Sequence, residues 1–230
     1  ALALSAAGMG MGNDEPFRVF VGIEEPLLQD QGIVPVDTPQ PGRILHYVVS
    51  ADQSFVLSEH VYPIDPLPFG AVNTGLVELM ALGTGGNFLS LERSYGLGGV
   101  RAKLFQTSFS DATDTATLTL LSPGTLNRQT SDETSDGLLE GDAIRGDLFE
   151  DSDASTEDNA LTFNLDGIQP MRKQLLLDLY DVGIRLDNLE GMTLGPRLPD
   201  GSRSLILVSD NNFNSDDQVT QFLLFRINGL

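Results

Sequence analysis

Four short segments of the 230-residue chain join an apolar run to one or more carboxylates, and these segments are the best candidates for chemistry. They span residues 20–30, 88–94, 187–192 and 207–213. Each is predicted to place its charge at the end of a β-strand. Carboxylates that converge on one channel from separate strands would supply the oxygen ligands that calcium prefers. The predicted calcium ligands are Glu24, Glu25, Glu92, Glu190 and Asp210.

The sequence offers little support for other catalytic chemistry. Cysteine is absent, which excludes disulfides, thiolate metal sites and a cysteine nucleophile. There is no Gly-x-Ser-x-Gly elbow and no phosphate-binding P-loop. The two histidines, His46 and His60, each lie in an apolar strand pattern, where a lone histidine is usually structural, and nothing in their spacing predicts that they meet. The strand-end carboxylates could equally be ordinary charges paired with arginine or solvent.

The charge balance narrows the range of partners. The chain has 13 basic and 33 acidic residues and a formal net charge of −20. A nucleic acid or an anionic membrane requires a basic surface, so neither is an expected partner. No apolar run reaches the length of about 18 residues that a transmembrane helix needs. We therefore expect no transmembrane segment.

Short apolar runs bounded by Gly, Pro, Asn and Asp predict an all-β fold, either a sandwich, a barrel or a propeller. A short strand is also predicted at the start of the chain, in Ala1–Ser5. Further strands are predicted at Phe17–Ile23, Arg43–Val49, Phe55–Tyr62, Leu76–Leu82, Asn87–Arg93, Arg101–Phe109, Ala116–Leu121, Gln174–Leu179, Leu189–Leu194, Ser204–Ser209 and Thr220–Ile227.

One segment differs from the rest in its charge. Residues 131–160 hold eleven carboxylates and a single base, Arg145. Eleven carboxylates cannot be buried without paired cations. We therefore expect a mobile, solvated surface excursion here, at the centre of an acidic insertion that runs from about residue 124 to 170.

The carboxylate segments, in this order, resemble the phytase-like domain family, also described as "esterase-like activity of phytase". The resemblance includes the opening Ala1–Ser5 strand, Gly75–Gly83 leading into Leu89–Ser94, and Asp187–Asn212 through Gln221–Phe225. Its most specific part is Asp187–Phe213. It extends over nearly the whole chain except residues 124–170.

The resemblance implies a single β-propeller-like domain over residues 1–230, from a secreted, periplasmic or envelope-associated bacterial protein. The predicted strands make fewer than three blades of four strands, too few to close a ring. We therefore expect an incomplete ring, completed either by a partner chain or by an upstream segment that is missing here.

The activity that the resemblance implies is the hydrolysis of phosphate esters such as phytate. In a calcium-dependent phosphoric ester hydrolase, the bound cation would present positive charge to phosphate and polarise water. Arg93 would clamp the phosphate oxygens, and the predicted catalytic residues are Glu92, Arg93 and Glu190. The alternative is a non-catalytic, calcium-stabilised propeller that acts as an envelope or extracellular scaffold or binding module.

Overall fold

The computed structural model describes residues 1–4, 16–32, 34–83, 85–116, 167–214 and 216–227. Its regular structure in these ranges is β-strand apart from two short 3-10 helices, Leu28–Asp30 and Leu179–Val182. The strands are β1 (Leu2–Leu4), β2 (Phe17–Gly22), β3 (Gln40–Val49), β4 (Ser54–Ile64), β5 (Ala71–Ala81), β6 (Asn87–Gly96), β7 (Gly99–Ser108), β8 (Arg172–Asp178), β9 (Leu189–Arg197), β10 (Arg203–Ser209) and β11 (Phe222–Ile227). Among these residues no helix is long and apolar enough to cross a membrane.

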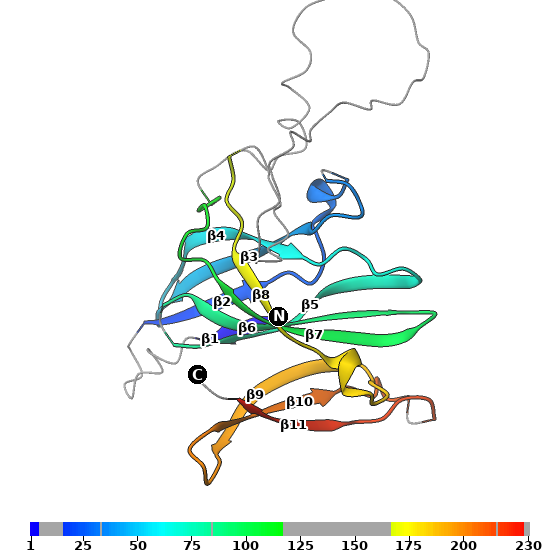
Figure 1. The fold of residues 1–230 in the computed structure, drawn as a ribbon. Coiled ribbons are helices and arrows are strands. Elements are labelled where there is room, and N and C mark those ends of the chain that lie inside the picture. The colour runs from blue at the N-terminus through cyan, green and yellow to red at the C-terminus, as the bar shows by residue number, and fades with distance from the viewer. Residues whose placement is uncertain (5–15, 33, 84, 117–166, 215, 228–230) are drawn as a thin grey trace, which may run out of the picture.

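The strands form three antiparallel sheets, each built from consecutive strands (Figure 1). The first sheet has the order β1-β2-β3-β4, the second β5-β6-β7-β8 and the third β9-β10-β11. The first strand of the second sheet, β5, packs against the first strands of both neighbouring sheets, β1 and β9. The all-β class is therefore confirmed. The described strands do not close into a barrel or a ring.

Two apolar cores hold the three sheets together. One joins the first and second sheets and includes Phe20, Tyr62 and Phe88. The other joins the second and third sheets and includes Leu91 and Leu205. The second sheet is therefore covered on both faces, which explains why its central strand β6 is buried continuously from Phe88 to Glu92 rather than at alternate positions.

The predicted strands largely match the observed ones, but not all of the predicted site residues lie at strand ends. Asp210 does follow directly after β10, and Glu24 and Glu25 lie just beyond the end of β2 at Gly22. Glu92 instead lies inside β6, because β6 continues past it and pairs with β7 as far as the Gly96–Gly99 turn. Glu190 is the second residue of β9 rather than its end. The predicted strand at 116–121, from residue 117 onwards, and the acidic segment 131–160 lie outside the described residues.

The contact between β5 and the segment after β2 depends on a glycine. The Leu76 amide donates a hydrogen bond of 2.9 Å to the Glu24 carbonyl. A Cβ atom added to Gly75 would lie 2.5 Å from that carbonyl oxygen, which is a backbone atom that cannot turn aside. Only glycine lets the two sheets approach this closely, and the approach directs Glu24 towards the second sheet.

We therefore predict that Gly75→Ala destabilises the protein by about 1–3 kcal/mol, the usual cost of overpacking. The measurement is the free energy of unfolding in denaturant. Gly98→Ala is the matched control, because a Cβ atom there meets nothing within 4 Å. We expect the control to be neutral. An equal loss of stability in both variants would contradict the proposed close contact.

Candidate functional site

Two predicted site residues, Glu92 and Arg93, are neighbours on β6 and so project from opposite faces of the second sheet. Glu92 faces the first sheet, where it contacts Tyr62 and Asp65. Arg93 directs its guanidinium to the other side, towards Glu190 of the third sheet. The strand geometry therefore separates two groups that were predicted to act in one channel.

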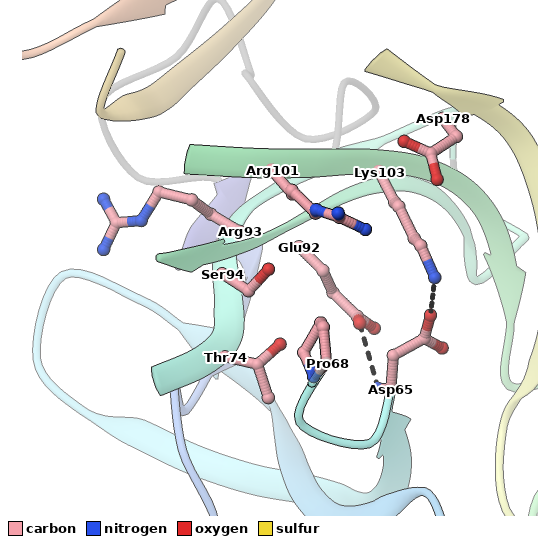
Figure 2. A pocket seen from close by; sticks show the side chains of 9 residues that line it. All are labelled: Asp65, Pro68, Thr74, Glu92, Arg93, Ser94, Arg101, Lys103 and Asp178. Carbon is pink, nitrogen blue, oxygen red and sulfur yellow. Dashed lines mark hydrogen bonds and ion pairs between the residues drawn. The ribbon is translucent and has the colours of Figure 1, made fainter. Parts of the chain in front are cut away.

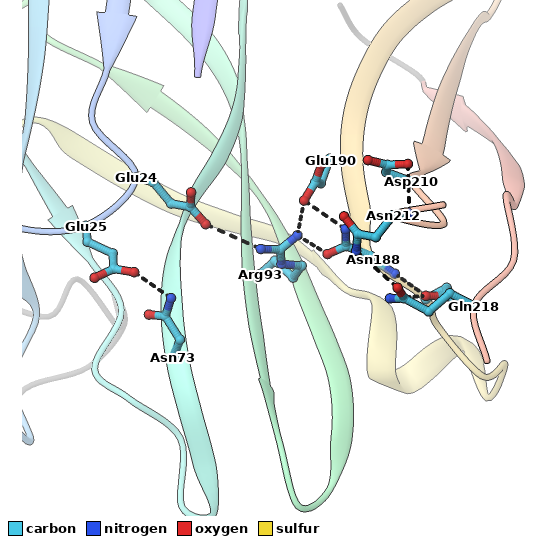
Figure 3. A network of polar contacts seen from close by, with 10 residues as sticks. Glu24, Glu25, Asn73, Arg93, Asn188, Glu190, Asp210, Asn212 and Gln218 are labelled. Atoms are coloured by element: carbon cyan, nitrogen blue, oxygen red, sulfur yellow. Dashed lines mark hydrogen bonds and ion pairs between the residues drawn. The ribbon is translucent and has the colours of Figure 1, made fainter. Parts of the chain in front are cut away.

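Arg93 links all three sheets (Figure 3). Its Nη1 atom donates to Glu190 Oε1 at 2.6 Å and also to the Asn188 side-chain oxygen. Its Nη2 atom lies 3.3 Å from Glu24 Oε1. Asn188 in turn donates 2.8 Å to Glu190, which fixes the carboxylate from a second direction. Three of the predicted residues, Glu24, Arg93 and Glu190, are thus brought together as one ion-pair cluster.

The other two predicted ligands have separate partners. Glu25 accepts a hydrogen bond of 2.5 Å from the Asn73 side-chain amide, apart from the Arg93 cluster in Figure 3. Asp210 follows β10 and accepts a 3.0 Å bond from the Asn212 backbone amide. Its own amide donates to the Asn188 carbonyl at 2.9 Å. Asp210 is therefore tied to the backbone beside the cluster and not to the Glu24 carboxylate.

The five predicted calcium ligands do not gather around one point. Calcium takes six to eight oxygen ligands. Within the described ranges no three Asp, Glu or His side chains gather in a way that could hold a metal. Glu24 and Glu190 share the guanidinium of Arg93, and Glu92 is paired with Lys173. Protein cations already provide the charge that calcium was expected to supply.

A small pocket of about 140 Å³ lies on the Glu92 side of the second sheet (Figure 2). Strand register explains its composition, because Glu92 is opposite Lys103 and Ser94 is opposite Arg101 on neighbouring strands. The connection from β4 to β5 closes one side. The lining residues are Asp65, Pro68, Thr74, Glu92, Arg93, Ser94, Arg101, Lys103 and Asp178.

The pocket floor is a buried network of two carboxylates and two ammonium groups. Lys173 bridges them, with Nζ 2.7 Å from Asp65 Oδ1 and a further bond to Glu92. Lys103 lies 2.7 Å from Asp65 Oδ2. The Tyr62 hydroxyl donates to Glu92 at 2.8 Å and the Asp65 amide donates at 2.9 Å. Each charged group of the floor therefore has an opposite charge in contact with it.

Burial and pairing shift the two carboxyl groups in opposite directions. Burial raises the pKa of Glu92, and the nearby Asp65 carboxylate raises it further, against the attraction of Lys173. Burial also favours the neutral form of Asp65, but Lys173 and Lys103 outweigh it and lower the pKa of Asp65. Of these two carboxyl groups, Asp65 is therefore the one whose ionised form is favoured.

Arg101 is the cation that differs from the others at the pocket. Its side chain is exposed, and its guanidinium lies 4.6 Å from the centre of the Tyr180 ring. Among the described residues no carboxylate lies within ion-pair distance of it. A guanidinium held over an aromatic face keeps its in-plane N–H donors free for an oxyanion.

Sequence reasoning did not select Asp65, Arg101, Lys103 or Lys173. Glu92 and Arg93 were the only pocket residues that it named. The sequence holds a partial signal for two of them. Arg101 and Lys103 are two residues apart on β7 and so share one face of the sheet, the face that also carries Glu92. Lys173 lies 81 positions from Glu92 in the sequence, and the β7–β8 pairing brings it to that carboxylate.

The family model for "Phytase-like: Esterase-like activity of phytase" matches residues 1–213. This match extends over most of the chain, so the chain belongs to the phytase-like family. The family description points in general terms to an esterase-like or phosphatase-like hydrolase. No curated protein and no solved structure matches the chain.

The buried network predicts a large effect of removing one ammonium group. We expect Lys173→Met to destabilise the protein by about 3–5 kcal/mol, because it leaves buried carboxylates uncompensated. This loss of stability should become smaller as the pH is lowered from 7 to 5. Without Lys173 the folded-state pKa of Glu92 rises further above its unfolded value, so lowering the pH lets the folded protein take up the proton first.

The neighbouring Arg172→Met is the matched control for this prediction. Arg172 forms only an exposed ion pair with Asp111, and its side chain is 72% exposed. Such surface pairs contribute at most about 1 kcal/mol. The measurement is the unfolding midpoint of each variant at pH 7 and at pH 5. A pH-independent loss in Lys173→Met would show that the ammonium does not offset a buried carboxylate.

Proposed function

We propose that the protein hydrolyses phosphoric esters at the pocket between Asp65 and Arg101. The observation that carries this proposal is the exposed guanidinium of Arg101, free of any ion pair in the described chain, at the mouth of a polar pocket. Membership of the phytase-like family supports the general class of reaction. In a chain of net charge −20, binding an anionic substrate requires such a local cation.

The pocket provides the groups that a phosphoryl oxygen needs. Arg101 offers paired N–H donors and Lys103 a second positive charge from the same strand. The Thr74 and Ser94 hydroxyls line the wall between them and the β4–β5 connection. A water molecule occupies roughly 30 Å³ of liquid, so a pocket of about 140 Å³ has room for a tetrahedral anion and a water.

Asp65 is the proposed general base. Its carboxylate stays ionised between two ammonium groups and lines the pocket. It would take a proton from a water whose oxygen attacks phosphorus, and the bond from phosphorus to the alcohol oxygen would break. The alcohol would leave with a proton from solvent at the open side. Glu92 acts here as a positioning residue, because it holds the Asp65 amide and Lys173.

The sequence predicts Arg93 and Glu190 as catalytic residues, but we propose a structural role for them. The Arg93 guanidinium already binds Glu24, Glu190 and the Asn188 side chain. Arg101 is therefore the better phosphate ligand. Arg93 lines the rim of the pocket while its charged end points away from it (Figure 2), and it would keep that rim fixed to the third sheet.

We further propose that the three sheets are consecutive blades of an incomplete β-propeller. The support is the meander order of each sheet and the packing of β5 against β1 and β9, the first strands of their sheets. A closed ring would need strands from another chain or from a segment outside this one. A secreted, periplasmic or envelope location in a bacterium stays a proposal that rests on the family alone.

The pocket predicts which arginine matters for hydrolysis. We expect Arg101→Ala to lower kcat/KM for p-nitrophenyl phosphate roughly ten- to hundredfold, since a hydrogen bond to a charged group is worth about 1.5–3 kcal/mol. Arg18→Ala, which removes an exposed strand arginine from the first sheet, should leave the rate unchanged. An equal loss in both variants would indicate general electrostatic attraction instead of a site. No hydrolysis by the wild-type protein would favour the alternative of a non-catalytic scaffold.

We propose that the Glu24 and Glu190 carboxylates can bind calcium, which would compete there with the Arg93 guanidinium. Millimolar calcium in 0.15 M sodium chloride should then raise the melting midpoint, and Glu190→Gln should reduce the rise. Arg93→Gln should enlarge it, because the variant frees two carboxylates. A matched increase in ionic strength from sodium chloride is the control. The same midpoint shift from both salts would show screening of the acidic surface and no calcium site.

A further inference from the structure

A serine and a histidine on β4 form a hydrogen-bonded pair outside the pocket described above. Ser58 and His60 are two residues apart on one face of the strand, and Ser58 Oγ lies 3.0 Å from His60 Nε2. The ladder between β3 and β4 shifts register immediately before Ser58, with Leu57 as the extra residue. Such bulges change the direction of a side chain and are frequent beside active sites.

The partners of His60 determine the direction of this hydrogen bond. His60 Nδ1 lies 3.0 Å from the Thr113 carbonyl oxygen, which can only accept. The proton of neutral His60 is therefore on Nδ1, and Nε2 accepts the Ser58 hydroxyl proton. On the other side of Ser58, His46 Nδ1 lies 3.4 Å away and donates to the hydroxyl oxygen. The two histidines thus meet at Ser58, which sequence spacing did not predict.

His60 is held in this orientation and is neutral. It is 5% exposed, and its ring stacks on Phe109 with centres 4.7 Å apart and an interplanar angle of 5°. Burial lowers the pKa of His60, although the Thr113 carbonyl and the nearby carboxylates of Asp114 and Glu59 act in the opposite direction. A neutral imidazole oriented by a fixed acceptor and bonded to a hydroxyl is the arrangement of a nucleophile with its general base.

We propose that Ser58 is a second reactive site, a nucleophile that accepts acyl groups from carboxylic esters. Ser58 Oγ bonds to the ester carbonyl carbon while its proton passes to His60 Nε2. The carbon–oxygen bond of the ester then breaks, and the alcohol leaves with that proton. In the second step a water molecule gives a proton to His60 Nε2 while its oxygen bonds to the acyl carbon. The bond from that carbon to Ser58 Oγ then breaks, Oγ takes the proton back from His60, and the carboxylic acid leaves.

The surroundings indicate a neutral, apolar ester as substrate. Ser58 is partly exposed, and the three residues before it, Phe55, Val56 and Leu57, are 52%, 48% and 47% exposed. Exposed apolar side chains therefore directly precede Ser58 along the strand, and an acyl chain bound there would contact apolar surface. Asp65 of the phosphate pocket is seven residues further along, roughly 23 Å at 3.3 Å per residue. The two sites are therefore separate and their activities can fail independently.

The test is covalent labelling with a fluorophosphonate probe, which reacts with activated serine hydroxyls. We expect one label per chain by intact mass, located at Ser58 by peptide mapping. Ser58→Ala should abolish labelling, and His60→Gln should slow it roughly a hundredfold or more, as loss of a general base does. Ser54→Ala, an exposed serine at the start of the same strand, is the control and should label like the wild type.

Two further readouts keep the proposal open to refutation if a variant fails to fold. In the wild-type protein, the labelling rate should level off by neutral pH and fall as acid protonates His60. The titratable groups around His60 that influence its protonation are Asp114, Glu59 and His46. The protein should also hydrolyse p-nitrophenyl butyrate, and Ser54→Ala should leave that rate unchanged. Labelling at other serines, or none at Ser58, would overturn the proposal without bearing on phosphate hydrolysis.

Discussion

The arrangement of this molecule depends on one strand that is covered on both faces and yet carries two adjacent charges. β6 lies between the two apolar cores, and Glu92 and Arg93 follow each other along it. A charge that leaves water must be paired, because its desolvation costs more than any single contact returns. Since strand geometry sends the two side chains to opposite faces, each interface between sheets must provide its own counter-charge.

The two interfaces meet this requirement with different chemistry. On one face, Lys173 from β8 reaches Glu92 and places Asp65 beside it, which creates a polar pocket within an apolar interface. On the other face, Glu24 and Glu190 approach Arg93 from two sheets and pair with its guanidinium directly. Such ion pairs contribute little net stability compared with apolar packing, but they penalise any other register between the sheets. The pocket is thus a consequence of the pairing of Glu92.

The sequence predicts the strands well because short apolar runs between glycine, proline and acidic residues carry a local signal. Strand alternation also indicates that Glu92 and Arg93, which are adjacent on one strand, face opposite sides of the sheet and not one channel. The rest required the pairing of distant strands. Neither the contact of Lys173 with Glu92 nor the pairing of His46 with Ser58 can be read from spacing, because each depends on strand order and register. The family resemblance, confirmed over residues 1–213, gave the class of protein without giving these contacts.

The strong acidity of the chain has different consequences for the two proposed sites. A phosphate ester approaches a surface of net charge −20 against repulsion, which salt screens over a length of about 8 Å at physiological ionic strength. Capture must therefore come from close contact with Arg101 and Lys103. A neutral carboxylic ester feels no such repulsion, and apolar side chains are exposed on the strand just before Ser58. The acidic surface would thus exclude anionic substrates from Ser58 and favour neutral ones, so that the two proposed sites divide ester substrates by their charge.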